Sequence, residues 1–154
     1  MNLWTGIAVG AIAAVVYGLS RLAKTGNDIV TEVKGRVHSI DFSKITFAID
    51  AVIKNPTPTS VTIQYPFIKI YYKDDLIASS DLINQTLKIA PLSQTHLNNI
   101  KIPVSFLKLS GAGAELLQKL QNKKTQVTLQ VHIQTQVLTG INRIAYNSKQ
   151  DVTI

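Results

Sequence analysis

The chain has 154 residues, a length typical of one domain or of one domain with an appendage. It contains no cysteine, which excludes disulfides, thiolate metal sites, iron–sulfur clusters and cysteine nucleophiles. Sixteen Lys and Arg against nine Asp and Glu give a formal net charge of +7, which favours an anionic partner such as a membrane surface or nucleic acid.

The first predicted element is apolar, because residues 1–20 carry no Lys, Arg, Asp or Glu. A helix over residues 3–19 would be roughly 26 Å long, close to the thickness of a hydrocarbon core. An aromatic side chain stands near each end, as at membrane interfaces. We therefore predict a single-pass anchor over residues 1–22, with the following side chains in the bilayer: Leu3, Trp4, Gly6, Gly10, Val15, Val16, Tyr17 and Leu19.

Two other interpretations of this segment stay open, a cleaved signal peptide and a buried core helix. A signal peptide needs a basic region before the apolar run and small residues after it, whereas Arg21 and Lys24 follow the run here. These two, with Lys34 and Arg36, are the predicted headgroup contacts. Because positive flanks stay inside, the C-terminal domain is predicted on the cytoplasmic side.

Residues 23–36 are predicted to be a connector that runs into a first strand, and residues 37–154 a β-sandwich domain. Apolar residues alternate with polar ones along the chain, as in strands with one buried face. The alternation is clear in two runs, formed by Phe47, Ile49, Ala51 and Ile53 and by Val127, Leu129, Val131 and Ile133.

Three local signals add detail to this β pattern. The apolar parity changes at Pro66, which predicts a bulge there. Lys73-Asp74-Asp75 predicts a hairpin turn. Pro103 lies within an apolar strand pattern, so we expect it to point outward from an edge strand.

One segment has a helical period instead, and it predicts a helix from about Ala112 to Asn122 that covers an open end of a sheet. The count is about seven short strands and one helix. The fold class is therefore predicted to be mainly β, an antiparallel sandwich with one short helix, preceded by a single N-terminal transmembrane helix.

Four motifs in order, over roughly residues 45–106, resemble the late embryogenesis abundant type 2 family, also called the WHy (water stress and hypersensitive response) domain. A strand ends in Asn55-Pro56, and a long hairpin with an aromatic residue follows. A linker containing Pro91 and a strand containing Pro103 complete the order. The resemblance implies a fibronectin-III-like sandwich, a desiccation-related role and no catalytic residues.

The Asn55-Pro56 motif also predicts a structural role on physical grounds, independently of the family resemblance. Proline removes a backbone donor and pushes the preceding residue into extended geometry, so the pair ends a strand. The Asn55 side chain can cap nearby backbone groups. We therefore expect a structural role for this motif.

Candidate chemistry is sparse. His38, His96 and His132 have no metal-ligand spacing, and no hydrolase or phosphate-loop motif is complete. We expect no catalytic residue, metal or cofactor. The basic residues are scattered without interleaved aromatics, which makes nucleic acid an unfavoured partner.

These features lead to three hypotheses of function. The first is a membrane-anchored, non-enzymatic binding or protective module, whose partners are the lipid bilayer and a protein or a second copy. The second is a structural membrane protein of a lipid-containing virus or phage particle, in which the polar face of residues 126–136 packs beside other copies and the domain faces inward from an internal membrane. The third is a lipid-binding sandwich.

Overall fold

The computed structural model describes residues 29–109, 111–122, 126–139 and 141–154. The predicted anchor, residues 1–22, lies outside this part of the chain, together with Arg21 and Lys24. Within the described part, no helix is both long enough and apolar enough to cross a bilayer.

Nine strands, one α-helix and one short 3-10 helix make up the described chain, which is therefore mainly β with one short helix, as predicted. In order they are β1 (Val30–Ile40), β2 (Lys44–Asn55), β3 (Val61–Gln64), β4 (Phe67–Tyr72), β5 (Asp75–Ser79), β6 (Thr86–Ile89), β7 (Ser93–Ser105), η2 (Phe106–Lys108), α2 (Ala112–Gln121), β8 (Thr128–Thr139) and β9 (Asn142–Thr153).

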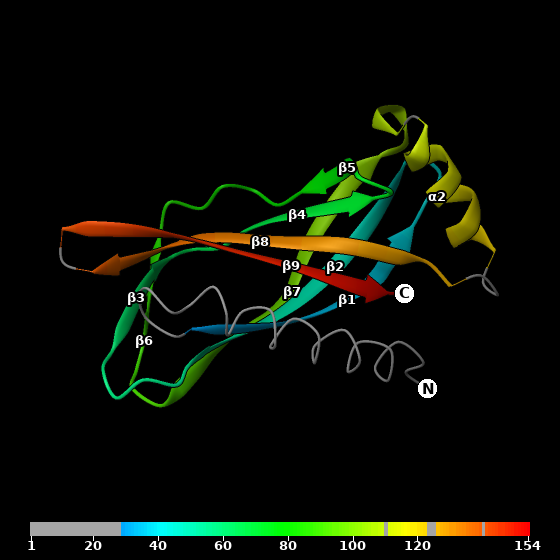
Figure 1. Cartoon of the computed structure of the whole chain (residues 1–154). Coiled ribbons are helices and arrows are strands. Elements are labelled where there is room, and N and C mark those ends of the chain that lie inside the picture. The colour runs from blue at the N-terminus through cyan, green and yellow to red at the C-terminus, as the bar shows by residue number, and fades with distance from the viewer. Residues whose placement is uncertain (1–28, 110, 123–125, 140) are drawn as a thin grey trace.

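The strands form two antiparallel sheets that face each other (Figure 1). The smaller sheet has the order β1-β2-β7. In the larger sheet β8 is central: β9 pairs with one of its edges, β3 and β4 lie end to end along the other, and β6 and β5 flank them. This arrangement is an antiparallel sandwich with curled sheets.

The core lies between the sheets, and period-two patterning fills it. Inward positions of β2, among them Phe47 and Ile49, pack with Ile68 and Ile70 of β4 and Ile133 of β8. All five are at most 2% exposed. Burying side chains of this size contributes about 1.5–3 kcal/mol each, so this core is a large source of stability.

The predicted change of parity at Pro66 is confirmed. Ile63 of β3 pairs with Val137, and Phe67 of β4 pairs with Gln134. The chain therefore advances four residues between β3 and β4 while β8 advances three, which leaves one extra residue beside Pro66. Because of the extra residue, odd-numbered positions face the core before Pro66 and even-numbered positions face it afterwards, as expected for a bulge. The turn at Lys73 and Asp74 is also confirmed, with left-handed φ values of 48° and 68°.

The predicted helix is confirmed as α2, which ends at Gln121, with Asn122 as its C-cap. Leu116 points into the core and is 1% exposed. Glu115 receives Lys73 Nζ at 2.7 Å from the β4–β5 turn and Lys119 Nζ at 3.3 Å from its own helix. The hydrogen bonds from Lys73 and Lys119 lower the pKa of Glu115. These contacts hold the helix over one end of the larger sheet, where Figure 1 shows it.

The two sheets meet most closely where β1 faces β9. A Cβ on Gly35 would lie 3.2 Å from both Ile49 Cδ1 and Val152 Cγ1, so only glycine fits here without displacement. Nearby, buried Gln150 donates from Nε2 to the Val33 carbonyl oxygen at 3.0 Å. The β1–β9 seam is thus closed partly by polar contacts.

Strand β1 continues to Ile40, so it crosses the boundary expected at residue 36. The described chain also has nine strands instead of about seven. Strand β6 is not among the predicted strands. The tail, where separate strand-like pieces at residues 144–146 and 152–154 are expected, is one twelve-residue strand.

Candidate functional site

Asn55, the centre of the Asn-Pro motif, is a buried hydrogen-bonding hub. Its side chain is 1% exposed at the end of β2. Nδ2 donates to the carbonyl oxygens of Thr59 at 2.7 Å, Ala90 at 3.1 Å and Ile89 at 3.2 Å. Oδ1 accepts from Thr57 N at 3.1 Å and Thr57 Oγ1 at 2.6 Å. The expected capping role is confirmed, and the contacts with residues 89 and 90 extend it to a second loop.

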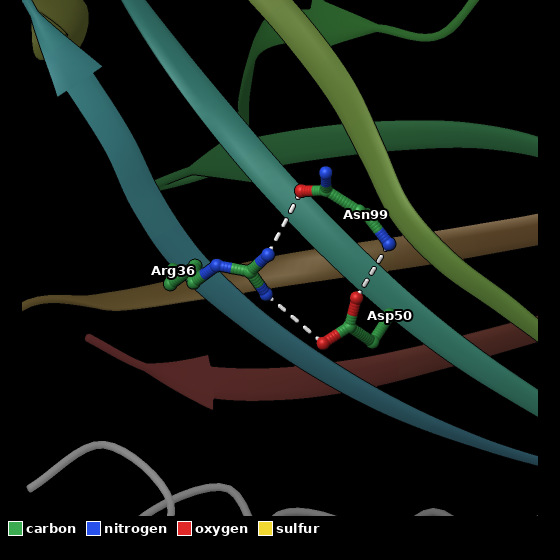
Figure 2. Close-up of polar contacts among 3 residues, drawn as sticks. All are labelled: Arg36, Asp50 and Asn99. Carbon is green, nitrogen blue, oxygen red and sulfur yellow. Dashed lines mark hydrogen bonds and ion pairs between the residues drawn. The ribbon is translucent and has the colours of Figure 1, made fainter. Parts of the chain in front are cut away.

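Arg36, a predicted headgroup contact, lies on the outer face of the smaller sheet in a three-residue cluster (Figure 2). Its guanidinium donates to Asp50 Oδ2 at 2.9 Å and to Asn99 Oδ1 at 2.8 Å. Asp50 Oδ1 accepts from the backbone N–H of Asn99 at 2.6 Å. Asn99 has φ 58° at a bulge in β7. The cluster therefore fastens the bulge to β1 and β2.

The other predicted residues of the described chain lie on the surface. Lys34 is half-buried on β1, two residues before Arg36. Pro56 and Pro91 are exposed in the loops that Asn55 joins. Pro103 is exposed on β7, an edge strand of the smaller sheet, as expected.

A cavity of about 470 Å³ opens on the outer face of the larger sheet, at the break between β3 and β4. We call it the amide hollow. Its lining comes from four strands, the link between β3 and β4, and the loop before β6: Gln64, Tyr65, Phe67, Leu82, Ile83, Asn84, Gln134, Thr135, Gln136, Ala145 and Asn147. Among the described residues, the lining contains no Asp, Glu, Lys, Arg or His.

Strand pairing explains why the amides gather there. Gln134 of β8 stands between Phe67 of β4 and Asn147 of β9, and Gln136 stands beside Ala145. The small side chain of Ala145 leaves space for the cavity at this position. The side-chain amides of Gln134 and Asn147 have no hydrogen-bond partner within the described chain. They are therefore available to donate and accept together.

Residues 82–84, which form one wall of the hollow, are held in place by hydrogen bonds from residues 64 and 65. Tyr65 N donates to the Gln85 carbonyl oxygen at 2.7 Å, and Gln64 Nε2 donates to that of Ile83 at 3.4 Å. Leu82 is nonetheless 82% exposed and Ile83 42%. The hollow thus combines uncharged polar groups with an exposed apolar rim, a composition typical of binding surfaces.

His132 lies on the same outer face, further along β8. Its ring lies 4.2 Å from the Tyr71 ring centroid, and its Nε2 lies 2.6 Å from Gln130 Oε1. Burial lowers the pKa of His132, and the charges of Lys149 and Lys69 lower it further. The imidazole is therefore neutral at physiological pH.

The described chain contains no group of three or more His, Cys, Asp and Glu able to hold a metal ion. His38, His96 and His132 stand on three different strands, and His96 contacts Gln94 at 2.9 Å.

The amide hollow was not predicted from the sequence. One signal was present, since Gln130, Gln134 and Gln136 share the outward parity of β8, and the sequence indicated a polar face there. Strand β9 joins β8 through a hairpin, but Phe67 of β4 pairs with Gln134 across 67 residues, and no local pattern contains that pairing or the place of the loop before β6.

No protein-family model matches the chain, and no curated protein is similar to it in sequence. Solved structures do share its fold. A protein from Archaeoglobus fulgidus is 14% identical, with a TM-score of 0.53, over 79% of this chain and 93% of that one. A protein from Arabidopsis thaliana, solved in solution, is 11% identical, with a TM-score of 0.51, over 79% and 78%. At these identities the likeness concerns the fold alone.

Proposed function

We propose that this chain is a single-pass membrane protein whose β-sandwich is a non-enzymatic binding module of the desiccation-related type. The charge-free N-terminal segment followed by Arg21 and Lys24 supports the anchor. The order of motifs around Asn55-Pro56, Pro91 and Pro103 supports the relation to the late embryogenesis abundant type 2 family, with its fibronectin-III-like sandwich.

The observation that carries a binding role is the amide hollow. The side-chain amides of Gln134 and Asn147, which have no hydrogen-bond partner among the described residues, offer paired donors and acceptors that match the backbone of a polypeptide. The exposed rim of Leu82 and Ile83 supplies the apolar contact. An uncharged segment of a protein partner, or of a second copy, fits this chemistry best.

Cross-linking in native membranes tests the proposal. The chain has no cysteine, so Asn84→Cys places a single photoactivatable cross-linker on the wall of the hollow. Asn98→Cys, on an exposed position of the other sheet, is the matched control. We expect the protein to stay in the membrane after alkaline extraction and to form one adduct from position 84, which Gln134→Ala abolishes. Identical adducts from both positions, or none from position 84, would contradict a binding hollow.

The particle-structural alternative also has an observation in its favour. The outward side chains of β8 include three glutamines, and such an uncharged face suits packing against other copies. Recovery at fixed copy number in purified particles would support it. A lipid-binding sandwich needs an elongated interior cavity, and the cavity described above opens at the surface instead.

A further inference from the structure

Two large apolar side chains stand almost fully in solvent on neighbouring turns at one end of the sandwich. Phe42, in the β1–β2 turn, is 97% exposed, and so is Leu107 in η2. The two turns are joined, because Phe106 N donates to the Ser43 carbonyl oxygen at 3.0 Å. We call the group formed by Ile40, Phe42, Lys44, Leu107 and Lys108 the Phe42 tip.

The turns that present these side chains are fixed by hydrogen bonds. Asp41 Oδ1 accepts from Ser43 N at 2.8 Å, Ser43 Oγ at 2.9 Å and Lys44 N at 2.9 Å. In η2, Leu107 N donates to Ser105 Oγ at 3.3 Å. The backbone that presents Phe42 and Leu107 to solvent is therefore held by these bonds.

The charge around the Phe42 tip and its small convex surface favour a lipid bilayer over a folded protein as its partner. Lys44 and Lys108 are exposed beside the apolar pair, and Asp41 is the carboxylate closest to it along the chain, already bonded to its own turn. Two convex side chains cover far less than the roughly 800 Å² per partner of a stable protein interface. A fluid bilayer needs no matching pocket, and anionic headgroups complement the lysines. We propose that the Phe42 tip is a lipid-contact site that inserts Phe42 and Leu107 into the interface of an anionic bilayer.

This site is separate from the proposed anchor. Strand β1 begins at Val30 and reaches the tip after eleven residues, about 36 Å of extended chain. Figure 1 shows the far end of β1 beside α2, while the turn between β8 and β9 lies at the other end of the molecule. Ile141, in that turn, is 99% exposed and so provides a matched apolar control.

Fluorescence of the full chain tests the site. An environment-sensitive dye on Phe42→Cys, in a chain without other cysteines, should brighten with vesicles of phosphatidylcholine and phosphatidylserine, and doxyl-labelled lipid should quench it. The same dye on Ile141→Cys should not respond. In unlabelled protein reconstituted in phosphatidylcholine liposomes, Phe42→Asp with Leu107→Asp should lower capture of anionic vesicles by roughly tenfold or more. Ile141→Asp should leave capture unchanged.

The outcomes separate this site from the anchor. Brightening without lipid quenching would mean that the tip meets another protein copy, which overturns the proposal, as would equal responses at both positions. Release of the chain by alkaline extraction would refute the anchor alone. The same aspartate variants, tested by flotation with anionic vesicles, would then decide the tip directly. Because Phe42, Leu107 and Ile141 are all exposed, circular dichroism should show unchanged folding in every variant.

Discussion

The side-chain amide of Asn55 donates a hydrogen bond of 3.1 Å to the carbonyl oxygen of Ala90, 35 residues further along the chain. The bond ties the end of β2 to the linker between β6 and β7, and so joins the two sheets at one end. A motif that reads locally as a strand terminator therefore also fixes the long-range closure of the sandwich.

The first prediction concerns this hub. Asn55→Ala should lower the free energy of unfolding by about 2–4 kcal/mol, because it leaves buried backbone carbonyls without a donor. Asn55→Asp should cost at least as much, because an ionised carboxylate cannot donate to three carbonyl oxygens. Urea unfolding followed by circular dichroism measures both. Exposed Asn84→Ala is the control, and an Asn55→Ala loss as small as the control's would contradict the hub.

The second prediction compares two members of the Arg36 cluster. Asp50→Ala should destabilise by about 1–2 kcal/mol, because the carboxylate accepts from the backbone of the β7 bulge as well as from Arg36. Arg36→Ala should cost less than about 1 kcal/mol, since the ion pair is about one quarter exposed and surface pairs contribute little. Urea unfolding again gives both values. The reverse order would mean that the ion pair, and not the bulge contact, is the stabilising element.

The third prediction concerns Tyr146. Burial raises the pKa of its hydroxyl to about 12, although the contact with Thr31 Oγ1 at 3.3 Å acts the other way. The folded state therefore keeps a proton that the unfolded chain loses near pH 10. This contribution is intact below pH 10 and falls between pH 10 and 12, by about 1.4 kcal/mol per pH unit. The wild-type stability minus that of Tyr146→Phe should decline across this window, and a constant difference would contradict the assignment.

The fourth prediction concerns His132. Burial, then the charges of Lys149 and Lys69, hold its pKa below 6.5. Its stabilising contribution is therefore present above pH 6.5 and is lost as the pH falls below that value. In an NMR titration, Lys149→Gln should raise the pKa of His132 while leaving the burial effect. Lys101→Gln, on the other sheet, should not change it. A normal titration in the wild-type protein would contradict this environment.

Much of the fold follows from the sequence, because period-two patterning is a local property. The inward alternation of β2 and β8, the break at Pro66 and the extent of α2 were all predictable from side chains close in sequence. The continuity of β9 was not, because its inward positions include Ser148 and Gln150, which are polar yet only 1% and 2% exposed. The carbonyl that accepts from Gln150 belongs to Val33, 117 residues away.

Only the second half of β7, the part around Pro103, was predicted from the sequence, for a related reason. The bulge at Asn98 and Asn99 shifts the inward parity between Leu97 and Ile100, so the alternation is interrupted. The role of Asn55 as a cap was predictable, whereas its contacts with residues 89 and 90 were not. The amide hollow and the Phe42 tip depend on which loops the topology brings together, and this information is not local.

Labelling of single cysteines in sealed vesicles of known orientation tests the central claim, a domain held at a membrane by residues 3–19, most directly. Asn2→Cys and Ile141→Cys place one thiol at each end of the chain. A membrane-impermeant maleimide should label position 141 only from the cytoplasmic face and position 2 only from the opposite face. Labelling of both positions from one face would show that the segment does not span the bilayer, and would contradict the account.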